Sequence, residues 1–381
     1  MTVAVASVIG AGTWSVASLR APDALNYDIA AQYLMRNGFS TSGLSSVAFF
    51  PGKQGYAYTL ATLYTGFGPS FAVALVGNAV ALGLLVPVIG DTVVRLSGRA
   101  AIGWTGPAIA LWPSLHFWGA QPLREAIIWL CCAAVINCIV RLVRHTSALP
   151  FVVAVAALAV LSTFRQYMSV VLAMALVITL LVTARSVGNR ARAVALLIVI
   201  GVPAALLLAQ TAGIQQVLNT ELAEVSLSEA EAGSATGASA DLSSPTAMLA
   251  TLPLAALAVL FGPPIWLASS PTYLFGAVDG LAWFVLLGLA IRGAWQLPAV
   301  RRSAAVAPTV AFLLTMAVLC MIAGNYGTIV RFRMELYVLL LPLVVCGLTR
   351  RPPAPAPAAQ SEERHEGAVE SSYEGLAHGR H

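Results

Sequence analysis

The sequence predicts an all-α protein that crosses a membrane many times, and three observations support this fold class. Apolar residues make up 59% of the 381 residues, whereas charged residues make up only 10%. The mean hydropathy is +0.82, and a soluble domain would carry roughly 25% charged residues. The apolar residues also gather into runs of roughly 20, the length at which a helix spans a bilayer. We therefore expect a polytopic bundle of transmembrane helices.

About ten runs are long and apolar enough to be spans. The first run lacks the basic residues that open a secretory signal, so we interpret it as a retained span rather than a cleaved leader. The expected spans are 2–19, 69–94, 101–118, 124–143, 147–163, 166–184, 194–212, 272–291, 304–323 and 335–349.

Arginines predict the orientation of these spans, because basic residues flank the cytoplasmic ends of membrane helices. They follow every second run, beginning with Arg95 and Arg99 and ending with Arg350 and Arg351. Both termini are therefore expected in the cytoplasm. The expected location is a bacterial inner membrane, crossed several times.

The segment 249–266 does not fit this alternation. A full crossing there would move Arg292, Arg301 and Arg302 to the outside. Proline and glycine also interrupt the segment. We therefore expect a re-entrant or interfacial helix, which requires protein or water around its free backbone groups.

The chain is expected to form one transmembrane domain, 1–349, followed by a tail. The tail, 350–381, is rich in Pro and Ala and then in charge, which is typical of a disordered cytoplasmic segment. On the outer side, 20–68 is expected to carry interfacial helices. The acidic stretch 213–247, rich in Ser, Ala and Gly, is expected to be a mobile loop.

Composition also argues against several classes of ligand. The pI of about 9.1 does not indicate nucleic acid, because the basic residues lie in short loops where they act as topology signals. All five cysteines fall inside apolar runs without the spacing of metal ligands, so they are expected to be buried and no metal site is predicted. No cofactor is expected, although the sequence leaves open whether a divalent metal takes part.

The first outer segment contains two aspartates five residues apart, Asp23 and Asp28, with Tyr27 beside the second. Pro22 is suited to the first position of a helix, which places Asp23 in the first turn at the positive end of the helix dipole. Two interpretations remain open. The carboxylates either charge the end of an interfacial amphipathic helix, or one of them takes a proton from a hydroxyl at the membrane surface.

Aromatic residues later in this segment are typical of a belt at the membrane interface. They are Tyr56, Tyr58, Tyr64 and Phe67. Lys53, which lies between glycines just before them, is a candidate contact for a phosphate.

The stretch "WPSLHFWGAQPLRE", 112–125, lies between two expected spans at the outer interface. Its tryptophans fit an aromatic belt, and a lone His116 is more often a hydrogen-bonded interfacial residue than a ligand. Arg124 and Glu125 are harder to explain in this way. A carboxylate at the mouth of a span is costly unless it faces a polar cavity.

Three further arginines, Arg165, Arg331 and Arg333, are expected on the outer side, against the positive-inside pattern. An anionic ligand at the outer leaflet would explain them, since the planar guanidinium matches phosphate oxygens. Asp279 is the carboxylate expected to be buried within a span, and Asn78 and Asn137 are expected to form hydrogen bonds between helices.

Several short motifs, taken in order, resemble the GT-C superfamily of membrane glycosyltransferases, and more narrowly the bacterial relatives of the protein mannosyltransferases. They are Asp-x4-Asp in the first outer segment, "LYTGFG", "PSLHFWGAQPLRE", "FRQY" and "NYGTIVRFRMELYVLLLPL". The resemblance extends over residues 20–348.

This resemblance implies a multispan helical fold and a polyprenyl-phosphate sugar as donor, with inversion at the anomeric carbon. The acceptor would be a glycan, a lipid or a protein of the cell envelope. It implies a catalytic aspartate in the first outer loop, Asp23 in preference to Asp28. The donor phosphate would meet Arg124, Arg165 and Arg331, and we add Arg333 and Lys53 as candidates. The residues expected to line the substrate cavity are Tyr27, His116, Glu125, Tyr167, Asp279, Asn325 and Tyr326.

Two other functions compete with this one. A non-catalytic, polymerising or flipping component of polysaccharide export would also need outward arginines, but not the first-loop carboxylate. A secondary transporter would place ionisable groups near the midplane of the membrane, where Asp279 is the only deep candidate. The absence of a glycine-rich phosphate loop in the sequence argues against a cytosolic nucleotide-sugar donor.

Overall fold

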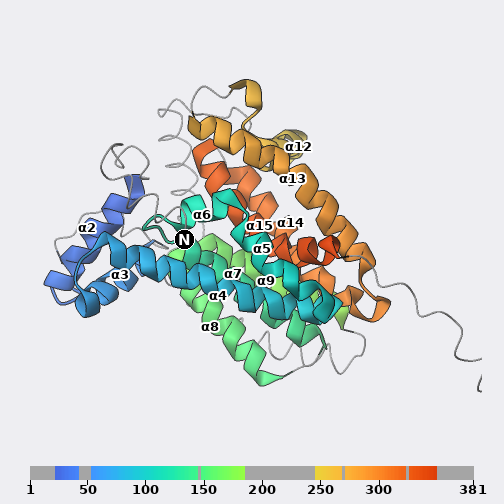
Figure 1. Cartoon of the computed structure of the whole chain (residues 1–381), viewed down its shortest axis with the longest axis horizontal. Coiled ribbons are helices and arrows are strands. Elements are labelled where there is room, and N and C mark those ends of the chain that lie inside the picture. Colours follow the sequence, from blue (N-terminus) through green and yellow to red (C-terminus); the bar gives the residue numbers. More distant parts are fainter. Residues whose placement is uncertain are drawn as a thin grey trace, which may run out of the picture. The chain divides into compact units, whose positions relative to one another are not determined.

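The computed structural model describes residues 22–42, 53–144, 147–184, 245–267, 271–322 and 326–349. Every element of regular structure in these ranges is a helix (Figure 1). The expected spans 2–19 and 194–212, the loop 213–247 and the tail 350–381 lie almost wholly outside the described residues, as does Asn325.

Five helices in the described ranges are long and apolar enough to cross a membrane. They confirm the spans expected at 69–94, 124–143, 166–184, 272–291 and 304–323. These helices are α4 (Phe71–Ser97), α7 (Glu125–Arg144), α9 (Gln166–Thr183), α13 (Pro271–Gln296) and α14 (Val306–Ile322), the last continuing from the 3-10 helix η6 (Ala299–Ala305). The protein is therefore a multi-pass, all-α membrane protein.

Two shorter apolar helices lie between them. The first, α8 (Ala148–Phe164), matches the span expected at 147–163. The second, α12 (Pro245–Phe261), contains Pro253 and leads into a 3-10 turn, η5 (Ile265–Leu267). The re-entrant or interfacial placement of this region stays a prediction.

Two helices of the segment expected on the outer side, α2 (Pro22–Arg36) and α3 (Gln54–Phe67), pack against each other (Figure 1). As predicted, α2 begins at Pro22 and carries Asp23 in its first turn. Both helices carry buried alanines, and side chains this small allow two helix backbones to come close. Tyr27 of α2 and Tyr56 of α3 pack edge to face, with ring centroids 5.2 Å apart.

The prediction of one continuous helix over 101–118 is wrong. The chain there forms three short helices, η4 (Arg99–Trp104), α5 (Thr105–Ala110) and α6 (Pro113–Gly119). Because a residue before proline is driven out of the helical conformation, Trp112 has extended backbone angles and separates α5 from α6.

The broken segment nevertheless runs back along α4, as a span would. Ile102 lies beside Gly90, and Gly119 lies against Leu82, two turns of α4 nearer to its start. Asn78, a further turn back, donates hydrogen bonds to the carbonyls of residues 121 and 123. The hydrophobicity of this segment therefore predicted its path, but not its regularity.

The last described helix, α15 (Tyr326–Leu348), begins nine residues before the expected span 335–349. The described part of the segment 324–335, which was expected on the outer side, is therefore helical, and its position relative to the membrane stays a prediction. Charged residues ended the apolar run in the sequence, yet Arg333 and Glu335 are fully buried in the structure. They remain helical because neighbouring helices supply their ionic partners.

Helices α13 and α15 cross with their backbones in contact. Gly293 lies against the carbonyl of Leu343, and Gly347 lies against the carbonyl of Leu289, so a Cβ atom at either glycine would clash. Small residues commonly allow such close crossings in membrane proteins. This crossing holds α15 at the centre of the bundle.

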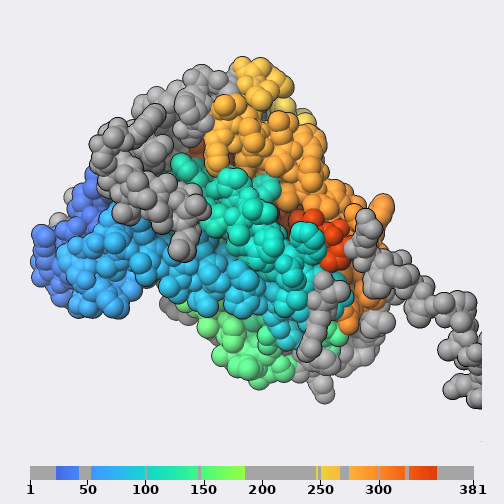
Figure 2. Space-filling view, in the orientation of Figure 1, coloured from blue at the N-terminus to red at the C-terminus, as the bar shows by residue number. Residues whose placement is uncertain are grey.

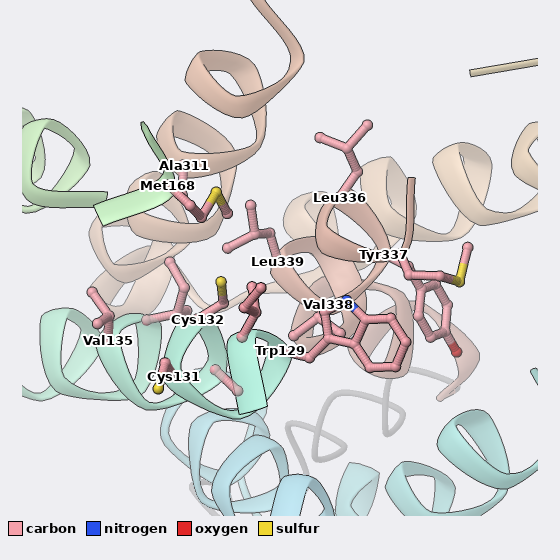
Figure 3. Packing of buried hydrophobic residues seen from close by; sticks show 14 of the residues in the cluster. Trp129, Cys131, Cys132, Val135, Met168, Ala311, Leu336, Tyr337, Val338 and Leu339 are labelled. Atoms are coloured by element: carbon pink, nitrogen blue, oxygen red, sulfur yellow. The ribbon is translucent and has the colours of Figure 1, made fainter. Parts of the chain in front are cut away.

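The core of the bundle is apolar and draws on several helices. Figure 3 shows Trp129 and Cys132 of α7 beside Met168 of α9, Ala311 of α14 and Leu339 of α15. The cysteines are all free and buried, as the sequence predicted.

The outward faces of the spanning helices are also apolar. Figure 2 shows one face of the molecule, where α4 in blue, the broken segment in teal and α13 in orange lie at the surface. Large apolar side chains from these elements are exposed in the structure, among them Val76, Leu111, Phe284 and Val285. Exposed apolar surface of this extent is expected where lipid covers a protein.

Candidate functional site

Arg331 of α15 connects two carboxylates that differ in their exposure. Its Nη1 lies 3.0 Å from Oδ2 of Asp23, whose side chain is 48% exposed. Its Nε lies 2.9 Å from Oε1 of Glu125, whose side chain is 1% exposed. The guanidinium group thus joins an accessible carboxylate on α2 to a buried one at the start of α7.

The ionic network continues inward from Glu125. Nη2 of Arg165 lies 3.0 Å from the same Glu125 oxygen, and its Nη1 contacts Oε1 of Glu335. The hydroxyl of Tyr167 donates to the other oxygen of Glu335 at 3.3 Å. The ring of Phe332 lies 4.1 Å from the guanidinium carbon of Arg165. Buried charges are tolerable only when they are paired in this way.

The ends of several helices bring these residues together. Arg165 lies between α8 and α9 with an extended backbone, and Arg124 immediately precedes α7. Nη1 of Arg124 donates to the carbonyl of Phe164 at 2.5 Å, which joins the start of α7 to the end of α8. Gly55 of α3 lies against Thr163 and Phe164, where a larger residue would clash.

We call this group of residues the Arg331 cluster. It comprises Asp23, Lys53, Arg124, Glu125, Arg165, Arg331 and Glu335. The four basic residues exceed the three carboxylates by one positive charge.

The electrostatic environment favours the ionised form of Asp23. Partial burial raises the pKa of its carboxyl group. The charge of Arg331 and its hydrogen bond lower the pKa, the charges of Arg124 and Lys53 lower it as well, and together they outweigh the effect of burial. The net result is a pKa below the ordinary value of 3.8. Burial raises the pKa of the neighbouring Tyr27, so its hydroxyl stays protonated.

Asp28, the other predicted candidate for the base, has different neighbours. Its Oδ1 accepts a hydrogen bond from Tyr64 at 2.6 Å, and its Oδ2 accepts one from Gln32 at 3.0 Å. Both of these partners are uncharged. Asp28 therefore helps to join α2 to α3.

The prediction of an aromatic belt on α3 is wrong for two of its four members. Tyr56 and Tyr64 are fully buried, whereas Phe67 is exposed. The hydroxyl of Tyr56 donates to Asn78 of α4 at 3.4 Å. Burial raises the pKa of both tyrosines, so their hydroxyls remain donors inside the fold. A belt residue would instead face the membrane interface.

Arg333 and Asp279 are not part of the Arg331 cluster. They form a separate pair, with Nη1 of Arg333 lying 3.1 Å from Oδ2 of Asp279. Arg333 also donates to the carbonyls of Val259, at 2.8 Å, and Gly262, and Ser114 donates to Asp279 at 2.5 Å. We call these residues the Arg333 cluster. Its charges are fully buried and satisfied by protein groups.

Two further predicted cavity residues, His116 and Tyr326, have other neighbours. The ring of His116 lies 3.1 Å from the carbonyl of Ile109 in the same broken segment. Tyr326 is buried at the start of α15, where it packs close to Gly262.

Glu335 is a member of the cluster that the sequence did not predict, because it opens an apparent span. Glu125 also lies at the start of an apparent span. A carboxylate at the start of an apolar run was therefore the signal that could have identified both Glu125 and Glu335. The expectation that Asp279 is the one carboxylate buried within a helix is therefore wrong, since Glu125 and Glu335 are buried more completely.

A third ionic group links the C-terminal parts of α4 and α7, whereas Glu125 of the Arg331 cluster lies at the N-terminal end of α7. Asp91 lies 2.7 Å from Arg95 and 2.9 Å from Arg141, and it accepts a hydrogen bond from Asn137 at 2.7 Å. The expected role of Asn137 between helices is thus confirmed. Within the described ranges, no group of three His, Cys, Asp or Glu side chains is arranged to hold a metal ion.

Comparisons with known proteins add little to this geometry. No family model matches the chain, and no curated protein does. Among solved structures, the chain is similar to ArnT from Cupriavidus metallidurans in the apo state, with a TM-score of 0.41 and 16% identity. The match covers 86% of this chain and 72% of the other. A TM-score this low assigns neither a family nor a function.

Proposed function

We propose that this protein is a membrane glycosyltransferase of the GT-C type. It would transfer a sugar from a polyprenyl-phosphate donor to a glycan, lipid or protein acceptor at the outer leaflet. The observation that carries the proposal is the pairing of Asp23 with Arg331: a half-exposed, ionised carboxylate lies 3.0 Å from a guanidinium group. These are the two groups that such a transfer requires in one place.

The reaction forms one bond and breaks one. The acceptor oxygen attacks the anomeric carbon while Asp23 takes the proton of the acceptor hydroxyl. The bond between the anomeric carbon and the phosphate oxygen breaks, and its electron pair stays on the polyprenyl phosphate. Arg331, with Arg124 and Lys53 nearby, would stabilise this developing charge. Attack from the side opposite the leaving group inverts the anomeric carbon.

The buried part of the Arg331 cluster would position these groups without touching the substrate. Glu125 holds Arg331 from the inner side, and Arg165 holds Glu125 in turn. Because these charges are almost completely buried, their arrangement is difficult to change. They therefore keep the guanidinium group of Arg331 at a defined place beside Asp23.

Asp23 is the better candidate for the base than Asp28. Both oxygens of Asp28 accept hydrogen bonds from uncharged side chains of the protein. Asp23 instead faces basic residues, which would also attract the donor phosphate. Base and leaving group would therefore meet at Asp23.

The experiment is a transfer assay with the purified full-length protein and a panel of polyprenyl-phosphate sugars. We expect Asp23→Asn to lower transfer by about 10²–10⁴-fold, the usual contribution of a general base. Asp28→Asn is the matched control, since it removes a carboxylate from the same helix, and it should keep most of the activity. An active Asp23→Asn variant would reject Asp23 as the base.

The assay also distinguishes the main alternative. A flipping component of polysaccharide export would move the lipid-linked sugar across the membrane and leave its sugar–phosphate bond intact. Translocation without transfer, unchanged in Asp23→Asn, would favour that function.

A further inference from the structure

The structure holds the proposed base in an ion pair with the proposed phosphate-binding group. Nη1 of Arg331 lies 3.0 Å from Oδ2 of Asp23, so each group spends part of its charge and hydrogen-bonding capacity on the other while the contact persists. We propose that the donor phosphate competes with Asp23 for Arg331, and that donor binding thereby releases Asp23 to act as the base. This inference rests on the proposed function and adds an order of events to it.

The two contacts of Arg331 differ in a way that suits such an exchange. The contact with Glu125 is closed to solvent, since the Glu125 side chain is only 1% exposed. The contact with Asp23 is accessible, because the Asp23 side chain is 48% exposed. A ligand can therefore displace Asp23 while Glu125 continues to hold the guanidinium group. Arg331 changes one partner without moving away.

The charge of the cluster fits the expected ligand. The cluster carries one positive charge in excess, and a polyprenyl-phosphate sugar is a phosphodiester with a single negative charge. Lys53 and Arg124 lie close enough to Asp23 to lower its pKa. They continue to favour the ionised form of Asp23 after Arg331 has bound the phosphate in its place. The released Asp23 thus stays ionised and can accept a proton.

The same competition assists product release. Transfer leaves a proton on Asp23, and a neutral carboxyl group no longer competes for Arg331. The product is a phosphomonoester, which carries a charge of about −1.5 to −2 near neutral pH and is held by the arginine. When Asp23 passes its proton to water, the carboxylate regains its charge. It can then take Arg331 back and displace the polyprenyl phosphate.

The experiment measures the affinity of the full-length protein for a short-chain polyprenyl monophosphate. We expect Asp23→Asn to bind this probe about tenfold more tightly than the wild type, which corresponds to one charge-assisted hydrogen bond regained by the phosphate. The same substitution would abolish transfer. A variant that binds more tightly and reacts less separates competition from a purely structural role.

Two further variants isolate the exchange at Arg331. Asp28→Asn removes a carboxylate of the same helix that does not pair with Arg331, and its affinity should equal that of the wild type. In an Arg331→Ala background, Asp23→Asn should no longer tighten binding. An equal gain in that background would mean that Asp23 merely repels the phosphate, and would overturn the inference.

The outcomes also separate this inference from the proposed function. If the wild type neither binds the probe nor transfers sugar, the proposed function fails. If it does both, and Asp23→Asn binds no more tightly, the exchange fails and the proposed function stands. Should Asp23→Asn not fold, wild-type kinetics decide. An acceptor analogue that inhibits uncompetitively against the donor supports donor-first binding, and competitive inhibition contradicts it.

Discussion

Arg331 and Arg333 lie two residues apart on α15, yet their surroundings differ in kind. Arg331 lies between a buried carboxylate and an accessible one. Arg333 is completely buried, and its partners are Asp279 and backbone carbonyls. Residues two apart on a helix point to nearly opposite sides, so the two arginines belong to different interfaces of α15.

This difference indicates which arginine can exchange partners. All the acceptors around Arg333 belong to the protein and are closed to solvent, so a ligand could bind only by breaking the fold. One of the two acceptors of Arg331 is half-exposed and can give way to a ligand. The two clusters therefore suggest a division between a structural arginine and a functional one. The following predictions test that division.

The largest expected effect is on stability. Arg333→Met leaves Asp279 buried without its ionic partner and removes donors from two buried carbonyls, so we expect it to destabilise the protein by about 3–5 kcal/mol. Unfolding of the full-length protein in detergent measures this. Arg331→Met is the matched control and should cost less, because Glu125 keeps its contact with Arg165. Equal losses in the two variants would remove the distinction between the clusters.

A smaller effect is expected in the pH dependence of transfer. In the free protein, Arg331, Arg124 and Lys53 hold the pKa of Asp23 below 3.8 despite its partial burial. A lowered pKa keeps the carboxylate ionised, so kcat/KM for the donor should fall only in strongly acidic solution. In the donor complex the phosphate neutralises Arg331, which raises the pKa of Asp23. The acid limb of kcat should therefore lie at a higher pH than that of kcat/KM.

Rate measurements over a pH series, at low and at saturating donor concentration, test whether the acid limb of kcat lies at a higher pH than that of kcat/KM. Coincident acid limbs would mean that donor binding leaves the environment of Asp23 unchanged. The ion pair with Arg331 would then persist in the complex.

The smallest effect is expected at the third ionic group. Asp91 and its arginines are about one-third exposed, with side-chain exposures of 29–38%. Partly exposed pairs of this kind contribute only about 0–1 kcal/mol. Asp91→Asn should lower the free energy of unfolding by no more than that and leave transfer unchanged. A large loss of transfer would extend the functional region to the opposite ends of α4 and α7.

The fold class and most of its described spans were predictable from the sequence, because burial in lipid demands long apolar runs and leaves few alternatives to helices. The error at 101–118 and the early start of α15 have local causes. Pro113 interrupts an apolar run that otherwise looks like one helix. Charged residues at the start of α15 hide helical turns that are stable only because of their partners.

The candidate site was predictable in part. Unusual charges near the ends of apolar runs indicated Asp23, Arg124, Glu125, Arg165 and Arg331, which the structure brings together. The same signal included Arg333, whose partners lie elsewhere.

By itself, the sequence determined that this is a helical membrane protein and that it carries unusual charges near the ends of its apolar runs, since both follow from the composition of local segments. Only the tertiary structure decided how those charges are paired. Arg331 and Asp23 are 308 positions apart, and Arg165 and Glu335 are 170 apart. Arg331 pairs with Glu125 and Arg333 pairs with Asp279 because α7 lies against one side of α15 and α13 against another. That arrangement is set by packing across the whole bundle, including the glycine crossing of α13 and α15.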